Sequence, residues 1–127
     1  MNYRILIVDD SPLLRATARR AVLQAGAAPE NVREAQNGKE ALEALRAEPA
    51  DIVLLDINMP VMDGYQFVEA KVKDPAFANT KVALVTTEGN KKRLERMTQL
   101  GVTHYLHKPF EPEELRALVA ALSQEGK

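Results

Sequence analysis

The sequence predicts an α/β protein in which five parallel strands form a doubly wound sheet and five helices connect them. Short apolar runs at residues 5–8, 52–55 and 82–85 lack the polar–apolar alternation of a half-exposed strand. Such runs are typical of strands that are covered on both faces. Helical patterns separate them, and regular strand–helix alternation favours right-handed crossovers between parallel strands. The 127 residues show no composition break, so we expect one domain over 1–127.

The first helix is expected to follow the strand at residues 5–8. Ser11 can cap this helix, Pro12 suits its first turn, and Gly26 suits its end. Its apolar residues fall on one face, and this pattern predicts that the basic residues face the solvent. These are Arg15, Arg19 and Arg20. The second strand is expected at residues 32–35.

Capping signals predict where the next two helices begin. Asn37 with Glu40, and Asp63 with Gln66, have the spacing of a capping box. A fourth helix is marked by three apolar residues at helical spacing and ends at Gly101; these are Leu94, Met97 and Leu100. Residues 104–107 predict the last strand. The fifth helix begins near Pro112 and is marked by Leu115, Leu118, Val119 and Leu122.

Composition excludes several classes of site. The chain has no Cys, which excludes disulfides, thiolate metal sites and cysteine nucleophiles. Its two His residues, His104 and His107, would point to opposite faces of a strand and therefore would not share a metal. The net charge of -1 gives no sign of a surface built for nucleic acid, and no apolar run is long enough to cross a membrane. We expect a cytoplasmic protein without membrane insertion or direct nucleic-acid contacts.

Three carboxylates follow strands at one predicted edge of the sheet, where ligands of doubly wound folds bind. Asp9 and Asp10 follow residues 5–8, and Asp56 follows residues 52–55. Three converging negative charges repel each other unless a cation compensates them, and oxygen ligands of this kind suit Mg²⁺. The alternative for the Asp9–Asp10 pair alone is a turn or a helix cap.

Thr86 and Lys108 follow two further strands at the same edge. Thr86 can offer a hydroxyl donor, and Lys108 can offer a fixed positive charge. Taken singly, the threonine is typical of a helix cap and the lysine of a solvated surface. Together with the carboxylates they supply the parts that phosphoryl transfer requires, since its catalysis is mainly positioning and charge neutralisation.

These stretches resemble the motifs of response-regulator receiver domains of two-component signalling, of the CheY-like single-domain type. The matching segments are residues 8–11, 55–64, 85–87 and 108–110, and the resemblance extends over 4–122. It implies a flavodoxin-like, CheY-like sheet with strand order 2-1-3-4-5. It also implies a phosphorylation-activated switch that uses Mg²⁺ and accepts a phosphoryl group from a histidine kinase or a small phosphodonor.

The resemblance assigns a role to each residue of the site. Asp56 would become the aspartyl phosphate, and Thr86 and Lys108 would bind the phosphoryl oxygens. Asp10 and Asp56 would ligate Mg²⁺ directly, Asp9 would act through water, and the Asn58 backbone carbonyl would complete the protein ligands. The bond before Pro109 is expected to be cis.

The same resemblance implies residues that modulate the switch. Tyr105 would rotate inward as Thr86 moves toward the phosphoryl group; the alternative is a constitutive half-buried strand residue. Asn58 and Glu88 would flank the path of hydrolytic water and favour rapid self-dephosphorylation, unless Glu88 is only a loop residue. Thr87 stands where the family often has Ala or Ser, and its bulk is expected to restrict access.

The expected function is a stand-alone switch, not an enzyme, acting through protein contacts. Its partners would be a histidine kinase or histidine-phosphotransfer protein and a downstream target that contacts the fourth helix, fifth strand and fifth helix. One alternative is a phosphorelay carrier that passes the group to a second histidine. A Mg²⁺-dependent phosphatase is disfavoured because Asp56 lies outside an Asp-x-Asp motif. An FMN carrier is disfavoured because acids follow the first strand, where a phosphate needs donors.

Overall fold

The protein folds around one sheet whose five strands are all parallel. The computed structural model describes residues 3–125, with side chains placed through Ser123. The strands lie in the order β2-β1-β3-β4-β5, as the resemblance implied. They are β1 (Ile5–Val8), β2 (Val32–Ala35), β3 (Ile52–Leu55), β4 (Lys81–Thr86) and β5 (His104–His107). The helices are α1 (Pro12–Gln24), α2 (Gly38–Ala47), α3 (Gly64–Lys73), α4 (Lys91–Gln99) and α5 (Pro112–Glu125), with short 3₁₀ turns η1 (Pro29–Asn31) and η2 (Pro75–Phe77).

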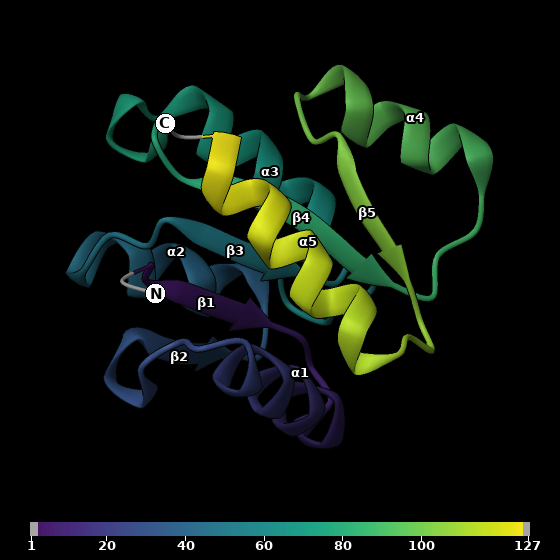
Figure 1. Ribbon diagram of the computed structural model, residues 1–127. Helices are drawn as coiled ribbons and strands as arrows, with labels where there is room; N and C mark the ends of the chain where they lie inside the picture. Colours follow the sequence, from purple (N-terminus) through teal and green to yellow (C-terminus); the bar gives the residue numbers. More distant parts are fainter. Residues whose placement is uncertain (1–2, 126–127) are drawn as a thin grey trace.

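Helices cover both faces of the sheet (Figure 1). On one face, α1 and α5 pack over an apolar cluster that includes Val22, Leu54 and Leu115. On the other face, α2, α3 and α4 enclose a second cluster that includes Phe67 and Met97. Within the described residues, no helix is long and apolar enough to cross a membrane.

Burial along the strands explains why some were easier to predict than others. Every residue of β1 and β3 is buried, which fits their continuous apolar runs. The edge strand β5 alternates instead: Leu106 packs against the α1–α5 cluster, whereas Tyr105 and His107 are exposed. β4 extends one residue beyond the predicted 82–85 at each end, so that Thr86 is its last residue.

The predicted caps are confirmed with one exception. The Ser11 hydroxyl accepts a hydrogen bond from the Leu14 N–H, and Asp63 and Gln66 form both halves of a capping box. Asn37 also caps α2 through the Glu40 N–H, but the second half of that predicted box is wrong. The Glu40 carboxylate instead accepts from the backbone and side chain of Gln36, and these hydrogen bonds lower its pKa.

The predicted solvent-facing position is wrong for two of the three arginines of α1. The Arg15 Nη1 donates to the Asp9 carbonyl at 2.6 Å, and the Arg19 Nη1 donates to the Val32 carbonyl at 2.9 Å. Both arginines also pair with Glu34 of β2. Long side chains on the flank of a helix can reach the backbone of a neighbouring strand, and a helical-face pattern does not show this. Arg20 is exposed, as predicted.

Candidate functional site

The carboxyl ends of β1, β3, β4 and β5 bring five of the predicted site residues together. The strand order reverses direction between β1 and β3, and this is where doubly wound sheets bind ligands. Backbone hydrogen bonds fix the register at this edge: the Asp56 N–H donates to Val8 O at 2.9 Å. The Lys108 N–H likewise donates to Thr86 O at 2.9 Å. The position of each side chain is therefore set by the sheet itself.

The three predicted aspartates form one cluster. One carboxylate oxygen from each of Asp9, Asp10 and Asp56 lies within 4.8 Å of the others. Asp9 and Asp56 are 5% and 7% exposed, whereas Asp10 is open to solvent. Such an arrangement needs a positive counter-charge, since buried like charges oppose each other's ionisation.

Lys108 supplies one positive charge to this cluster. Its side chain is 6% exposed, and its Nζ donates to Asp9 Oδ2 and lies 3.7 Å from Asp56 Oδ2. The bond between Lys108 and Pro109 is cis, as the resemblance implied. One ammonium against three carboxylates leaves two negative charges, which matches the charge of a divalent cation.

The environment of Asp56 favours its neutral form. Burial raises the pKa of this carboxyl, and the nearby negative charge of Asp9 raises it further. A hydrogen bond from Thr86, the charge of Lys108 and the Ile57 N–H at 2.9 Å act in the opposite direction but do not cancel the effect of burial. An oxygen-binding cation beside these carboxylates would favour their ionised forms, so the donor set and its charge fit Mg²⁺.

The loop after β3 is held close to Asp56 by Gly64, the last residue of the family-like segment 55–64. A Cβ at Gly64 would lie 2.7 Å from the Asp56 carbonyl oxygen and 2.8 Å from the Ile57 Cα. The Gly64 N–H donates to Ile57 O at 2.8 Å. The glycine therefore permits α3 to begin against the end of β3, and the Asp63–Gly64 pair was the only sequence signal of it.

Thr86 connects the acid cluster to the loop before α4. Its fully buried hydroxyl bonds Asp56 and accepts from the Glu88 N–H at 3.2 Å. The Tyr105 hydroxyl donates to Glu88 O at 2.7 Å, while 39% of the tyrosine remains exposed. One backbone segment thus contacts both residues that the resemblance assigned to the switch.

The Glu88 side chain belongs to a different set of contacts. Its Oε1 lies 2.7 Å from Arg93 Nη1, and the Arg93 guanidinium lies over the Tyr65 ring at 5.1 Å. Arg96 also lies over this ring and pairs with Glu69 of α3. The sequence alone did not indicate this link between α4 and α3, because it depends on packing between two helices.

The remaining predicted residues lie at the surface of the site. Asn58, Thr87 and Pro109 are exposed, each within two residues of a buried member of the cluster. No side-chain hydrogen bond of these three is seen within the part of the chain that the structure describes.

A profile of the response regulator receiver domain matches residues 5–120. The chain belongs to the response-regulator receiver family. This receiver domain is 30% identical over 121 residues to a probable chemotaxis protein CheY of Rhizobium etli, with 95% of this chain and 92% of that protein covered. It is 36% identical over 114 residues to chemotaxis protein CheY1 of Helicobacter pylori, covering 89% of this chain and 90% of the relative.

Solved structures agree with the receiver fold. CheY4 of Vibrio cholerae superposes with a TM-score of 0.86 at 31% identity, covering 96% of this chain and 99% of that chain. The receiver domain of a signal transduction histidine kinase from Syntrophus aciditrophicus gives a TM-score of 0.87 at 26% identity over 98% of this chain and 92% of that one. The chain is therefore a CheY-like receiver of two-component signalling, and its acid cluster occupies the ligand-binding edge of that fold.

Proposed function

We propose that this receiver accepts a phosphoryl group on Asp56 and that the modification alters its partner-binding surface. The observation that carries the proposal is the buried cluster of three carboxylates with Lys108 inside it. Asp10 and Asp56 would hold Mg²⁺ directly, Asp9 through water, and the Asn58 carbonyl would complete the protein ligands. Bound Mg²⁺ would neutralise charge on the transferring phosphoryl oxygens.

Asp56 acts as the nucleophile in this proposal. A carboxylate oxygen of Asp56 forms the new P–O bond while the P–N bond of a phosphohistidine breaks and the imidazole leaves. Lys108 already lies 3.7 Å from the Asp56 carboxylate, and its ammonium is placed to bind a phosphoryl oxygen. The protein's own contribution is therefore positioning and charge, as phosphoryl transfer requires.

The hydroxyl of Thr86 provides the link from modification to surface. In the unmodified protein this hydroxyl bonds Asp56 and holds the Glu88 N–H. A phosphoryl group on Asp56 adds negative charge and stronger acceptors, so the hydroxyl would turn toward it and release its Glu88 contact. Glu88 O is the acceptor for Tyr105, so the tyrosine would leave its exposed position, and the α4–β5–α5 face would change.

Exposed residues beside the cluster would set how long the phosphoryl group lasts. Asn58 and Thr87 lie at the surface of the site, where attacking water must pass. The Glu88 carboxylate is held by Arg93, so its influence on this water would depend on that ion pair. We expect rapid self-dephosphorylation, and a decay lasting many hours would contradict this.

The proposed phosphodonor is a histidine kinase or a histidine-phosphotransfer protein. The sensor histidine kinase CheAY of Helicobacter pylori contains a stretch 36% identical to 120 residues of this chain, which covers 15% of that kinase. Similar receivers thus occur joined to a kinase as well as in separate proteins.

Labelling with acetyl phosphate or phosphoramidate tests the proposal directly. In the presence of Mg²⁺ the protein should gain the mass of one phosphoryl group, and borohydride reduction followed by peptide mass spectrometry should place it on Asp56. The Asp56→Asn variant should gain no label, while Asp63→Asn, which changes an acid outside the cluster, should label as the parent does. Undiminished label in Asp56→Asn would overturn the assignment.

A further inference from the structure

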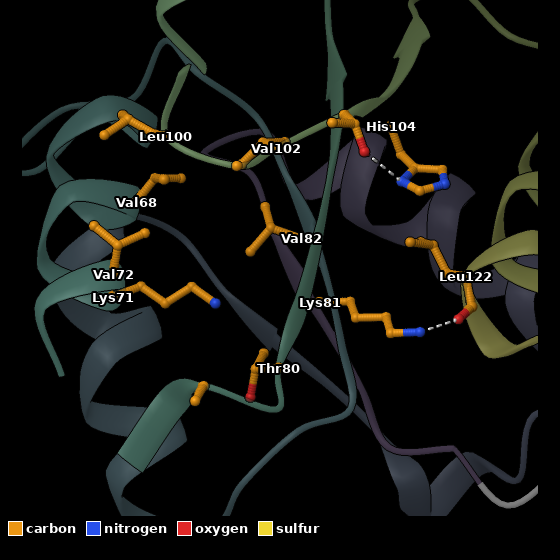
Figure 2. A pocket seen from close by; sticks show the side chains of 13 residues that line it. Val68, Lys71, Val72, Thr80, Lys81, Val82, Leu100, Val102, His104 and Leu122 are labelled. Carbon is orange, nitrogen blue, oxygen red and sulfur yellow. Dashed lines mark hydrogen bonds between the residues drawn. The ribbon is translucent and has the colours of Figure 1, made fainter. Parts of the chain in front are cut away.

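A second site lies at the opposite edge of the sheet, where the strands begin. A cavity of about 240 Å³ is enclosed by the end of α3, the start of β4, the loop before β5 and the last turns of α5 (Figure 2). None of the acid-cluster residues lines it. The receiver function described above therefore leaves this cavity unused.

Positive charge gathers in this cavity without negative charge to balance it. Lys71 and Lys81 both line it, and no Asp or Glu is among the described residues of its wall. Asp51 lines an adjoining hollow with Lys81, but its carboxylate accepts the Arg4 N–H at 2.8 Å. Figure 2 shows the Lys81 side chain turned away from Lys71, toward Leu122 of α5, so Lys71 is the ammonium that faces the apolar wall formed by Val82.

Lys71 is the less satisfied of the two. Figure 2 shows its side chain extending past Val72 with the nitrogen turned toward the interior of the cavity. Among the described residues its ammonium has neither a hydrogen bond nor an ion pair, and burial lowers its pKa. Lys81 Nζ instead donates at 3.0 Å to the Leu122 carbonyl in the last turn of α5, where the end of the helix favours a cation. A partly buried cation without an anion is energetically costly, so this site favours the binding of an anionic ligand.

The remaining walls of the cavity are apolar. Val82 and Val102 are 8% and 6% exposed and belong to the core cluster, and Val68 and Leu122 add further aliphatic surface. A small inorganic anion would pair with Lys71 but leave this apolar surface in contact with water. An anion with a hydrocarbon body would use both kinds of wall.

We propose that this cavity binds a small organic carboxylate whose head group pairs with Lys71. Its short aliphatic or aromatic body packs against Val82 and Val102. This inference does not depend on phosphorylation of Asp56, since the two sites lie at opposite edges of the sheet.

Titration of the ¹⁵N-labelled full chain with hexanoate tests the inference. Saturable shifts should appear in amides at residues 71–72, 80–82 and 101–104, with a dissociation constant of the order of 1 mM. Hexan-1-ol, which lacks the charge, and inorganic phosphate, which lacks the hydrocarbon, should each bind at least roughly tenfold more weakly, since a charge-assisted hydrogen bond or a few buried methylenes contributes about that much.

Matched variants separate a specific site from general attraction to a basic surface. Lys71→Met keeps the apolar stem and should weaken hexanoate binding roughly tenfold. Lys73→Met removes an exposed lysine from the same helix and should leave binding unchanged, and Asp56→Asn should bind as the parent does. Equal loss in the two lysine variants, equal binding of hexan-1-ol or phosphate, or no saturable shift would each overturn the proposal.

Discussion

The two edges of the sheet bury charge in opposite ways. At the carboxyl edge, Asp9 and Asp56 are nearly enclosed and Lys108 compensates only part of their charge. At the amino edge, Lys71 lies in a cavity whose described wall contains no acid. The sign of the charge that the fold leaves uncompensated indicates the sign of the ligand, so one edge suits a cation and the other an anion.

Helix direction reinforces this difference. In a doubly wound fold each connecting helix begins near the carboxyl edge and ends near the amino edge. Helix C-termini favour cations, and Lys71 and Lys73 lie in the last turn of α3. The positive charge of Lys71 is thus stabilised in part by the end of its own helix, while Lys108, which follows β5, depends on the aspartates. Removing Lys108 should therefore have larger consequences than removing Lys71.

The largest effect is expected for Lys108→Met, which separates metal binding from phosphoryl transfer. Loss of the ammonium should lower the rate of labelling by acetyl phosphate roughly 100-fold, the usual cost of removing one stabilising group from a developing anion. Affinity for Mg²⁺ should rise, because the competing positive charge is gone. Labelling kinetics and calorimetry measure the two effects; a parallel fall in both would contradict the role given to Lys108.

Gly64→Ala tests the close approach that holds the carboxyl edge together. The new methyl group would meet backbone atoms of Asp56 and Ile57 at under 3.0 Å. We expect the free energy of unfolding to fall by about 1–3 kcal/mol, and Mg²⁺-dependent labelling to slow as the loop shifts. Gly89→Ala is the control, since nothing lies within 4 Å of its Cβ position. Denaturant unfolding of both variants provides the comparison; equal stability would show that the loop yields without strain.

Asp56→Asn should stabilise the protein in the absence of Mg²⁺. Burial raises the pKa of Asp56, so the folded state binds its proton more tightly than the unfolded chain does. Ionisation of this group therefore lowers the free energy of unfolding. The loss begins as the pH rises through the pKa of Asp56 in the unfolded chain, and it is complete above the higher pKa of the folded state. At pH 7 the variant should gain about 1 kcal/mol, and the gain should vanish below the unfolded pKa.

Unfolding curves at several pH values measure this gain. Asp63→Asn is not a neutral control here, because Asp63 caps α3. Mg²⁺ should stabilise the parent more than Asp56→Asn. A variant that is less stable than the parent at neutral pH would contradict the unfavourable burial of this carboxylate.

The smallest effect is expected at the amino edge. Burial lowers the pKa of Lys71, so the folded state holds its proton less tightly than the unfolded chain. The charged ammonium therefore lowers the free energy of unfolding at neutral pH. This loss disappears as the pH rises from the pKa of Lys71 in the folded state to its higher pKa in the unfolded chain. Lys71→Met should raise stability by no more than about 0.5 kcal/mol at pH 7, because water still reaches this side chain. Thermal unfolding beside Lys73→Met measures it; a clear loss of stability in Lys71→Met alone would contradict the account.

The sequence predicted the strands and most of the carboxyl edge for an identifiable reason. Apolar runs such as 5–8 and 52–55 end in aspartates, and the carboxyl ends of parallel strands must meet. The residues that meet at this edge can therefore be predicted from the ends of the strands alone, without knowing how the helices pack. The prediction of β5 from residues 104–107 rested on a weaker pattern, since a half-exposed edge strand has no continuous apolar run.

Features that depend on contacts between elements were not predictable in the same way. Arg15 was expected to face the solvent, but its guanidinium reaches the carbonyl of Asp9, which follows β1. The Arg93 contact with Tyr65 joins two helices, and the cavity of Lys71 is enclosed by four separate segments. Helical periodicity identifies the face of a helix, but it does not show which atoms of another element that face meets.

Paramagnetic line broadening by Mn²⁺ tests the central claim most directly, because Mn²⁺ takes the same oxygen ligands as Mg²⁺ and reports its own location. Trace Mn²⁺ should first broaden the amide signals of residues 9–11, 56–58 and 108, and excess Mg²⁺ should restore them. Broadening that is centred away from Asp9, Asp10 and Asp56, or that Mg²⁺ does not reverse, would contradict a divalent-cation site at the carboxyl edge of the sheet.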